Sequence, residues 1–280
     1  MKILKLNYNL TYCFTYLLFF SFILTQSCKK PGCTDPNATN YNPSANTDDF
    51  SCEYDSVSTF ELIWEVNHMF RNDSFSYFTD YFDDSNNLIQ FSRISMYVGK
   101  TQYGKNGVFN YSNEAYVLIN PDETQYNFGS IEDTSINNFQ SLIGVDSITN
   151  HLDPALYNSS NPLSYQTPSM HWQMGTDPQN WSYLFLVMEG FVDMNQNSLF
   201  EPGEYFVYHI GGDEFISNTN TINFNPTINS SNDFIIQLEI DWSEAINGIN
   251  MSTDNFTHTM DNIPLAQNLV ANCVNLIEAN

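Results

Sequence analysis

Alternation of apolar and polar residues at every second position constrains the fold of this chain most strongly. Residues 60–70 (FELIWEVNHMF) keep this period throughout and place Trp64, Val66 and His68 on one face, which predicts a β-strand. Residues 183–188 (YLFLVM) form a continuous apolar run of strand length. The alternation recurs in shorter form in residues 94–98, 116–119, 205–210 and 234–242. Many short strands separated by Asn-, Ser-, Gly- and Pro-rich turns predict an all-β fold, an antiparallel β-sandwich.

The C-terminal segment departs from this pattern and predicts a short helix. Asp261 can cap a helix and Pro264 occupies a first-turn position. Apolar residues then recur at helical spacing, at Leu265, Leu269, Cys273, Leu276 and Ile277. We expect this stripe to pack on the sandwich, with Cys273 as a buried and unreactive thiol.

The charge balance excludes several classes of partner. The chain has 8 Lys+Arg against 32 Asp+Glu, a formal net charge of −24. Nucleic acids and anionic membrane surfaces are bound through stripes of Lys and Arg, which this composition does not supply. A hydrophobic fraction of 42% is nevertheless sufficient for a large core. The composition favours an extracytoplasmic protein that binds cations.

Residues 1–27 are typical of a bacterial lipoprotein signal peptide. Lys2 and Lys5 precede an apolar run over residues 10–24, and the sequence LTQSC then ends at Cys28, the expected lipidation site. A transmembrane helix is the alternative, but it requires about 20 uninterrupted apolar residues. We therefore expect an outer membrane lipoprotein of a Gram-negative bacterium, periplasmic or surface-exposed, which contacts the membrane only through its lipid anchor.

Residues 28–56 form a separate small module before the main domain, residues 57–280. Their sequence, GCTDPNATNYNP followed by DDFSC, resembles a short Cys-bounded, Asp/Asn-rich module of bacterial secreted and surface proteins. Cys33 and Cys52 lie in an oxidising compartment if the signal is correct, so we expect them to form a disulfide. The module either binds Ca²⁺ through its side-chain oxygens or serves as a plain spacer.

Residues 193–204 (DMNQNSLFEPGE) match the spacing of a twelve-residue Ca²⁺ loop. The candidate ligands are side-chain oxygens and one backbone carbonyl, at Asp193, Asn195, Asn197, Leu199 (the carbonyl), Glu201 and Glu204. Ser198 stands where the sharp turn of the motif prefers Gly. Two amide ligands also lower the charge of the site. We expect a calcium site of the weak, extracellular kind.

Enzymatic catalysis receives no support from the sequence. The chain lacks the nucleophile elbow, the dinucleotide-binding glycine motif and the phosphate-binding loop. The histidines also lack the close spacing of a helical metal pair; they are His68, His151, His171, His209 and His258. We expect a protein that is not an enzyme.

Residues 57–280 resemble the MbnP-like copper-binding proteins. The resemblance rests on short blocks in a fixed order: FEL (60–62) leading to His68, FSRISMYV (91–98), IGVDS (143–147), LDP (152–154), MHWQ (170–173), YLFLVMEG (183–190), YHIGG (208–212) and His258. This chain differs where the family commonly has a second Trp, because it has Met174, followed by an insertion over residues 175–180. The calcium-like loop is also inserted, and the four-cysteine motif of one subgroup is absent.

The resemblance implies copper binding outside the cytoplasm. The candidate ligands are His68, His171, His209, His258 and Met170, since imidazole suits copper and a thioether suits its cuprous form. Some members carry a tryptophan that a dihaem partner, similar to cytochrome c peroxidases, oxidises to kynurenine. That implies Trp172 and Trp64 as candidates for modification, with a role in core packing as the alternative for Trp172.

Two functions therefore follow from the sequence. The first is an extracytoplasmic, lipid-anchored metal-binding protein whose metal is copper and which serves copper binding or copper homeostasis. The alternative is a Ca²⁺-stabilised structural or adhesive surface module without a copper site. The histidines distinguish the two functions, because a protein that binds only Ca²⁺ has no need of imidazole ligands.

Overall fold

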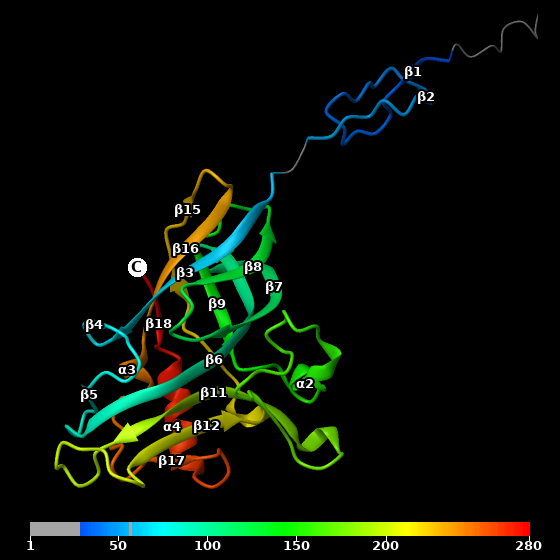
Figure 1. Cartoon of the computed structure of the whole chain (residues 1–280). Helices are drawn as coiled ribbons and strands as arrows, with labels where there is room; N and C mark the ends of the chain where they lie inside the picture. The colour runs from blue at the N-terminus through cyan, green and yellow to red at the C-terminus, as the bar shows by residue number, and fades with distance from the viewer. Residues whose placement is uncertain (1–28, 56–57) are drawn as a thin grey trace, which may run out of the picture. The chain divides into compact units, whose positions relative to one another are not determined.

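The computed structural model describes residues 29–55 and 58–280. The described residues fall into two compact units that divide between Ser58 and Thr59 (Figure 1). The predicted signal peptide, residues 1–27, and the predicted lipidation site Cys28 lie outside the described residues, so both stay predictions.

The first unit is a small disulfide-linked module. Its strands β1 (Pro31–Gly32) and β2 (Thr47–Asp48) pair in parallel. Cys33 and Cys52 form a disulfide, with their Cα atoms 4.7 Å apart, which confirms the predicted pairing. Asp and Asn side chains accept hydrogen bonds from nearby backbone N–H groups, as in the bond from Asn37 to Asp35 at 2.9 Å. The polar composition of the module is therefore used to build its turns.

The second unit consists of two β-sheets. The larger contains β5 (Tyr81–Phe82), β6 (Leu88–Lys105), β7 (Val108–Ile119), β9 (Asn138–Ile143), β10 (His171–Gln173), β11 (Trp181–Val192), β12 (Tyr205–Gly211), β13 (Ser217–Asn218), β14 (Ile222–Asn223) and β17 (Phe256–Thr257). The smaller contains β3 (Phe60–Phe70), β4 (Asp73–Ser74), β8 (Gln125–Ile131), β15 (Thr227–Ile228), β16 (Asp233–Asp241) and β18 (Ile277–Ala279).

The helical segments of this unit are short. They are α2 (Ser147–Asn150), α3 (Trp242–Ala245), α4 (Ile263–Cys273) and the 3₁₀ turns η1 (Pro154–Leu156), η2 (Pro178–Asn180) and η3 (Asp213–Phe215). None of the helices in the described part of the chain is long and apolar enough to cross a membrane. The mostly strand structure confirms the predicted all-β, sandwich-like fold with a short C-terminal helix.

Most strand pairs are antiparallel, but two pairs in this unit are parallel. The central strands β3 and β16 of the smaller sheet pair in parallel from Glu61 opposite Asp233 to Met69 opposite Asp241. At the edge of the larger sheet, β12 and β17 pair in parallel through Val207–Phe256 and Tyr208–Thr257. The alternation of the sequence identifies the strands but contains no information about which strands pair or in which direction.

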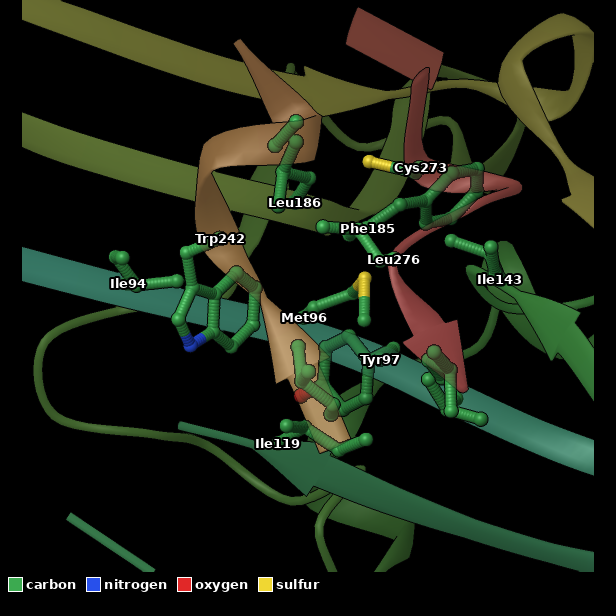
Figure 2. Packing of buried hydrophobic residues seen from close by; sticks show 14 of the residues in the cluster. Ile94, Met96, Tyr97, Ile119, Ile143, Phe185, Leu186, Trp242, Cys273 and Leu276 are labelled. Atoms are coloured by element: carbon green, nitrogen blue, oxygen red, sulfur yellow. The ribbon is translucent and has the colours of Figure 1, made fainter. Parts of the chain in front are cut away.

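The core lies between the inner faces of the sheets and is rich in aromatic residues. Burial along β3 alternates as predicted, and Trp64 is fully buried. Its indole N–H donates to the Tyr103 hydroxyl at 3.1 Å, and its ring packs against Phe128 and Phe139. Figure 2 shows another part of this core, where Trp242 and other apolar side chains pack together above β6. Trp64 is thus a core residue.

The C-terminal helix is shorter than its apolar spacing suggests. Asn262, not Asp261, caps α4, because the Asn262 side chain accepts from the backbone N–H of Leu265 while Asp261 accepts from that of His258. The helix ends at Cys273, and Ile277 instead begins β18, where it pairs with Ile240. Burial of the Cys273 thiol raises its pKa to about 12, which keeps it protonated and unreactive as predicted.

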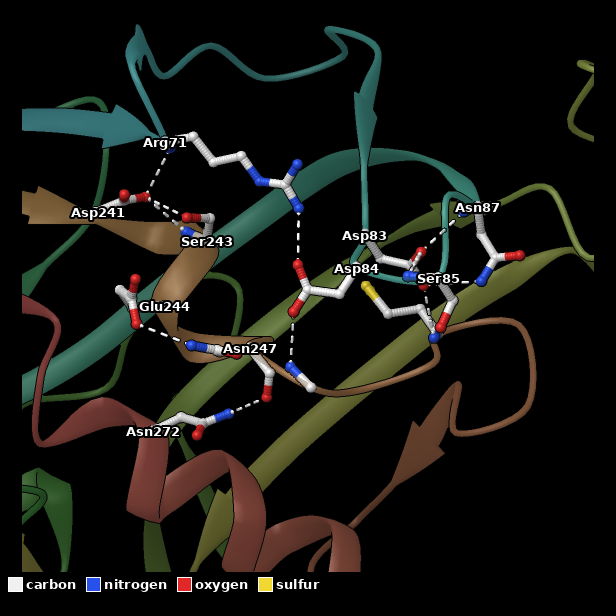
Figure 3. A network of polar contacts seen from close by, with 12 residues as sticks. Arg71, Asp83, Asp84, Ser85, Asn87, Asp241, Ser243, Glu244, Asn247 and Asn272 are labelled. Atoms are coloured by element: carbon white, nitrogen blue, oxygen red, sulfur yellow. Dashed lines mark hydrogen bonds and ion pairs between the residues drawn. The ribbon is translucent and has the colours of Figure 1, made fainter.

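A polar network fixes the loop that leads into β17. The buried carboxylate of Asp83 accepts hydrogen bonds from the backbone N–H groups of Ser85 and Asn87 and, across the fold, of Met251 (Figure 3). The neighbouring Asp84 pairs with Arg71 at 2.9 Å. This network anchors the segment before β17 and so supports the position of the residues that follow that strand.

Candidate metal site

Two imidazole rings lie together at the edge of the larger sheet. His209 belongs to β12 and His258 follows β17, and their ring centroids are 4.9 Å apart with an interplanar angle of 27°. The parallel register of β12 and β17, which ends at Tyr208 opposite Thr257, places the next residue of each strand side by side. The strand pairing therefore brings together two histidines that are far apart in the sequence.

Glu189 and Arg93 orient the first of these rings. Glu189 Oε1 lies 2.8 Å from His209 Nε2 and 2.9 Å from Arg93 Nη1, and Glu189 is opposite Arg93 in the register of β11 and β6. The hydrogen bond from His209, assisted by the charge of Arg93, lowers the pKa of Glu189 despite its partial burial. An ionised carboxylate only accepts, so His209 Nε2 donates its proton to Glu189, and in the neutral ring Nδ1 is the nitrogen with the lone pair.

The second ring is held more loosely. The backbone N–H of His258 donates to Asp261 Oδ1 at 2.7 Å, while its Nδ1 is 4.0 Å from Asp261 Oδ2. Its side chain is 49% exposed, and Phe256 packs against it with a centroid distance of 4.6 Å. His258 therefore has room to turn its ring towards a ligand held by His209.

Met170 and Trp172 lie on the same side of the larger sheet as this pair. The buried Met170 sulfur is 3.2 Å from Arg93 Nη2, so the thioether contacts the group that holds Glu189. A Cβ atom at Gly211, two residues after His209, would come within 3.3 Å of the Trp172 indole. The partly buried Trp172 ring thus covers β12 near His209.

His68 has a structural role. The indole N–H of Trp242 donates to His68 Nδ1 at 3.2 Å, so Nε2 carries the proton and donates to the Glu123 carbonyl at 2.8 Å. Burial lowers the pKa of His68 and keeps it neutral. Since both ring nitrogens are already bonded, His68 offers no free lone pair to a metal.

His171 lies in β10 among aromatic residues. Its ring packs edge-on against Tyr183, with centroids 4.8 Å apart, and Nε2 is buried without a hydrogen-bond partner. Burial lowers its pKa to about 4, so the ring stays neutral over most of the pH range. In residues 29–55 and 58–280, no ring contact joins His171 or His68 to His209 or His258. The structure therefore brings two of the four predicted histidine ligands together and places the other two elsewhere.

The number of ligands at the site is small. Over the two described ranges, no group of three or more His, Cys, Asp or Glu side chains is placed to hold a metal ion. Sequence reasoning had also missed Glu189, Arg93 and Asp261 as residues of this site. No spacing in the chain connects Glu189 and Arg93 to the histidines, because strand pairing across the sheet brings them there, whereas Asp261 follows His258 by three residues.

The predicted calcium loop connects β11 to β12 and has its two end carboxylates buried. Asp193 accepts from the backbone N–H of Asn197 at 3.1 Å and of Ser198 at 2.6 Å. Glu204 accepts from the backbone N–H of Asn195 at 3.2 Å and, through its other oxygen, of Glu201 at 2.8 Å. These oxygens organise the loop around its own backbone donors, and Glu204 Oε1 also accepts a second bond, from the backbone N–H of Met194 at 3.1 Å.

The other predicted side-chain ligands also bond within the loop, where Glu201 accepts from Asn195 Nδ2 at 2.9 Å. Asn195 Oδ1 accepts from Asn197 N–H, and Asn197 Oδ1 accepts from Leu199 N–H. Ser198 has φ of 65°, the left-handed conformation for which the motif uses Gly. The backbone thus makes the turn of the motif with a less suitable residue.

Comparison with known proteins identifies the family. The family model MbnP matches residues 59–261, which include both paired histidines, Glu189 and Arg93. The chain belongs to the MbnP family. A solved structure of MbnP from Methylosinus trichosporium is similar at a TM-score of 0.47 and 11% identity, covering 68% of this chain and 78% of that one. No curated protein matches this member of the MbnP family.

Proposed function

We propose that this MbnP-family protein binds copper outside the cytoplasm through His209 and His258, as cargo and without catalysing a reaction. The observation that carries the proposal is the stacked imidazole pair within the residues that the family model matches. The sequence-based resemblance to copper-binding proteins and the predicted lipoprotein signal support an extracytoplasmic, lipid-anchored protein.

The donor set fits a soft ion better than Ca²⁺ or Mg²⁺. Imidazole nitrogen suits copper, whereas hard cations require six or more oxygen ligands. The ionised Glu189 holds the proton of His209 on Nε2, as a carboxylate does for many metal-bound histidines, and so presents Nδ1 to the ion. Two imidazoles without a third strong ligand favour the cuprous ion, which accepts low coordination numbers.

A haem-containing redox partner remains part of this proposal. If such an enzyme oxidises a tryptophan of this protein, we expect Trp172 to be the target. It is partly buried and covers β12 two residues from His209, whereas Trp64 is enclosed in the core. A mass increase that maps to the peptide containing Trp64 would contradict this assignment.

Titration of the apoprotein with Cu(I) under a competing chelator tests the site. We expect saturation near one equivalent, and at least tenfold weaker binding in His209→Ala and in His258→Ala. His151→Ala is the matched control, because His151 bonds to Trp181 O and Asp213 in a separate part of the fold. Loss of binding in His171→Ala together with wild-type binding in His258→Ala would move the site to β10.

A second function, a surface module stabilised by Ca²⁺, is favoured by the loop of residues 193–204. Its backbone adopts the left-handed turn of the motif at Ser198, and its end carboxylates, Asp193 and Glu204, are buried together. Wild-type copper binding in both His209→Ala and His258→Ala would leave this function as the better account.

A further inference from the structure

The outer face of β11, β12 and β17 carries exposed aromatic side chains that no element of the described chain covers. Phe191 is 38% exposed, Tyr205 47% and Phe256 39%, values at which a soluble protein usually has polar residues. We call this surface the aromatic stripe; it consists of Phe191, Phe200, Tyr205, Val207 and Phe256.

Strand register makes the stripe continuous. Phe191 packs against Phe200 with centroids 5.8 Å apart and is opposite Tyr205 in the pairing of β11 and β12. Val207 follows on the same face of β12 and is opposite Phe256 in β17. Phe256 in turn packs against His258, so the stripe runs from the calcium-like loop to the imidazole pair.

Acidic residues predominate around the stripe. The chain has no Lys or Arg after Lys105, and exposed acidic residues flank the stripe in sequence at Glu201, Asp254 and Asp261. Arg93, which shares Glu189 Oε1 with His209, is already paired with that carboxylate. A second copy of this chain would bring these carboxylates against one another, whereas a surface with Lys and Arg around an apolar centre would be complementary.

We propose that the aromatic stripe is the docking surface for a basic protein whose contact patch is apolar and ringed by Lys and Arg. This inference rests on the proposed function in one respect: the partner that docks on the stripe is taken to be the one that reaches the copper site at His209 and His258. Aromatic residues in the centre of an interface provide most of the binding energy, and complementary charge at the rim accelerates encounter.

Cytochrome c is a suitable probe, because its exposed haem edge lies in an apolar patch ringed by lysines. We expect it to bind the full chain at low salt in a calorimetric or NMR titration, and to bind more weakly as salt rises. Phe191→Ser and Tyr205→Ser should each weaken binding at least threefold, and the double variant at least tenfold. Cytochrome c with succinylated lysines should not bind.

Ile148→Ser is the matched control, since Ile148 is 80% exposed on α2, outside the stripe. Thermal melts establish that the variants fold. Failure of cytochrome c to bind at low salt, equal binding by the double variant, or dimerisation of the free protein through Tyr205 would overturn the proposal. Copper titration of the double variant separates the two hypotheses, because its copper affinity should equal that of the wild type whether or not docking is lost.

Discussion

At the scale of single residues, the hydrogen-bond partners of a histidine decide what it can bind. His68 and His151 have both ring nitrogens engaged, whereas the bond from His209 to Glu189 leaves one nitrogen free. The local sequence around the four histidines proposed as ligands does not show which of them can bind a metal. They differ because strand pairing supplies different neighbours to each.

Glu189→Gln should weaken Cu(I) binding about 10- to 100-fold, the usual effect of removing a carboxylate that orients a metal-bound histidine. The amide can still accept a hydrogen bond, but it no longer holds the proton on His209 Nε2 through charge, and it leaves Arg93 unpaired. Asp213→Asn beside His151 is the control and should bind copper as the wild type does. Unchanged affinity in Glu189→Gln would argue against His209 as a ligand.

The buried His171 makes stability depend on pH. Its pKa is about 4 in the folded protein and about 6.5 in the unfolded chain, so between these values the unfolded state binds more protons. Stability should therefore fall as pH decreases from about 6.5 to 4, in addition to the effect of the carboxylates. His171→Gln should show a smaller decrease of Tm over this interval. A pH profile of Tm parallel to that of the wild type would contradict the low pKa.

At the scale of elements, the insertion between β11 and β12 has the backbone of an ion-binding loop and is tied to the sheet. The backbone N–H of Asp193 donates to the Leu88 carbonyl of β6 at 2.9 Å, and Phe200 packs on Phe191 of β11. An ion bound here would therefore stabilise both the adjoining ends of β6, β11 and β12 and one end of the aromatic stripe.

Millimolar Ca²⁺ should raise the Tm of the second unit, because an ion that binds only the native state stabilises it by about 2.7 kcal/mol at a hundredfold excess over Kd. Asp193→Ala should remove most of this rise. Ser198→Gly should increase the affinity for Ca²⁺, because Gly adopts the left-handed conformation of this position without the strain that Ser incurs. Differential scanning calorimetry with and without Ca²⁺ measures both effects. The same rise in Asp193→Ala would place the ion elsewhere, for example in residues 35–49.

At the scale of the whole molecule, the described residues form a small disulfide-linked module and, after it in the sequence, one large sandwich domain with its own core. Each unit has its own stabilising interactions, the Cys33–Cys52 disulfide in the first and the aromatic core in the second. Changes in one unit should therefore have little effect on the stability of the other.

The double variant Cys33→Ser/Cys52→Ser should leave the Tm of the second unit unchanged while making the first unit susceptible to proteases. Loss of the disulfide removes a cross-link from a unit with almost no apolar core. Limited proteolysis followed by mass spectrometry, together with calorimetry, checks both parts. A clear fall in the main transition would show that the two units stabilise each other.

The sequence by itself determined those features that depend on neighbours along the chain. Period-2 alternation specified β3 and β12, and the continuous apolar run specified β11, because burial on one or both faces of a sheet selects these patterns. The Cys33–Cys52 disulfide was also predicted from the sequence, and so was the buried thiol of Cys273, from its place in the helical apolar spacing. The resemblance to the MbnP family was correct because it rested on several ordered blocks, and the family model then matched residues 59–261.

Only the tertiary structure decided which of these residues meet. The parallel pairing of β12 with β17 creates the His209–His258 pair, and the register of β6 with β11 sets Arg93 against Glu189. Strand direction and register depend on how the whole core packs, and residues far apart in sequence carry no local signal of it. The same reason explains why His68 became a bonded core histidine, with Trp242 as its partner, when its strand pattern had equally allowed it to be a ligand.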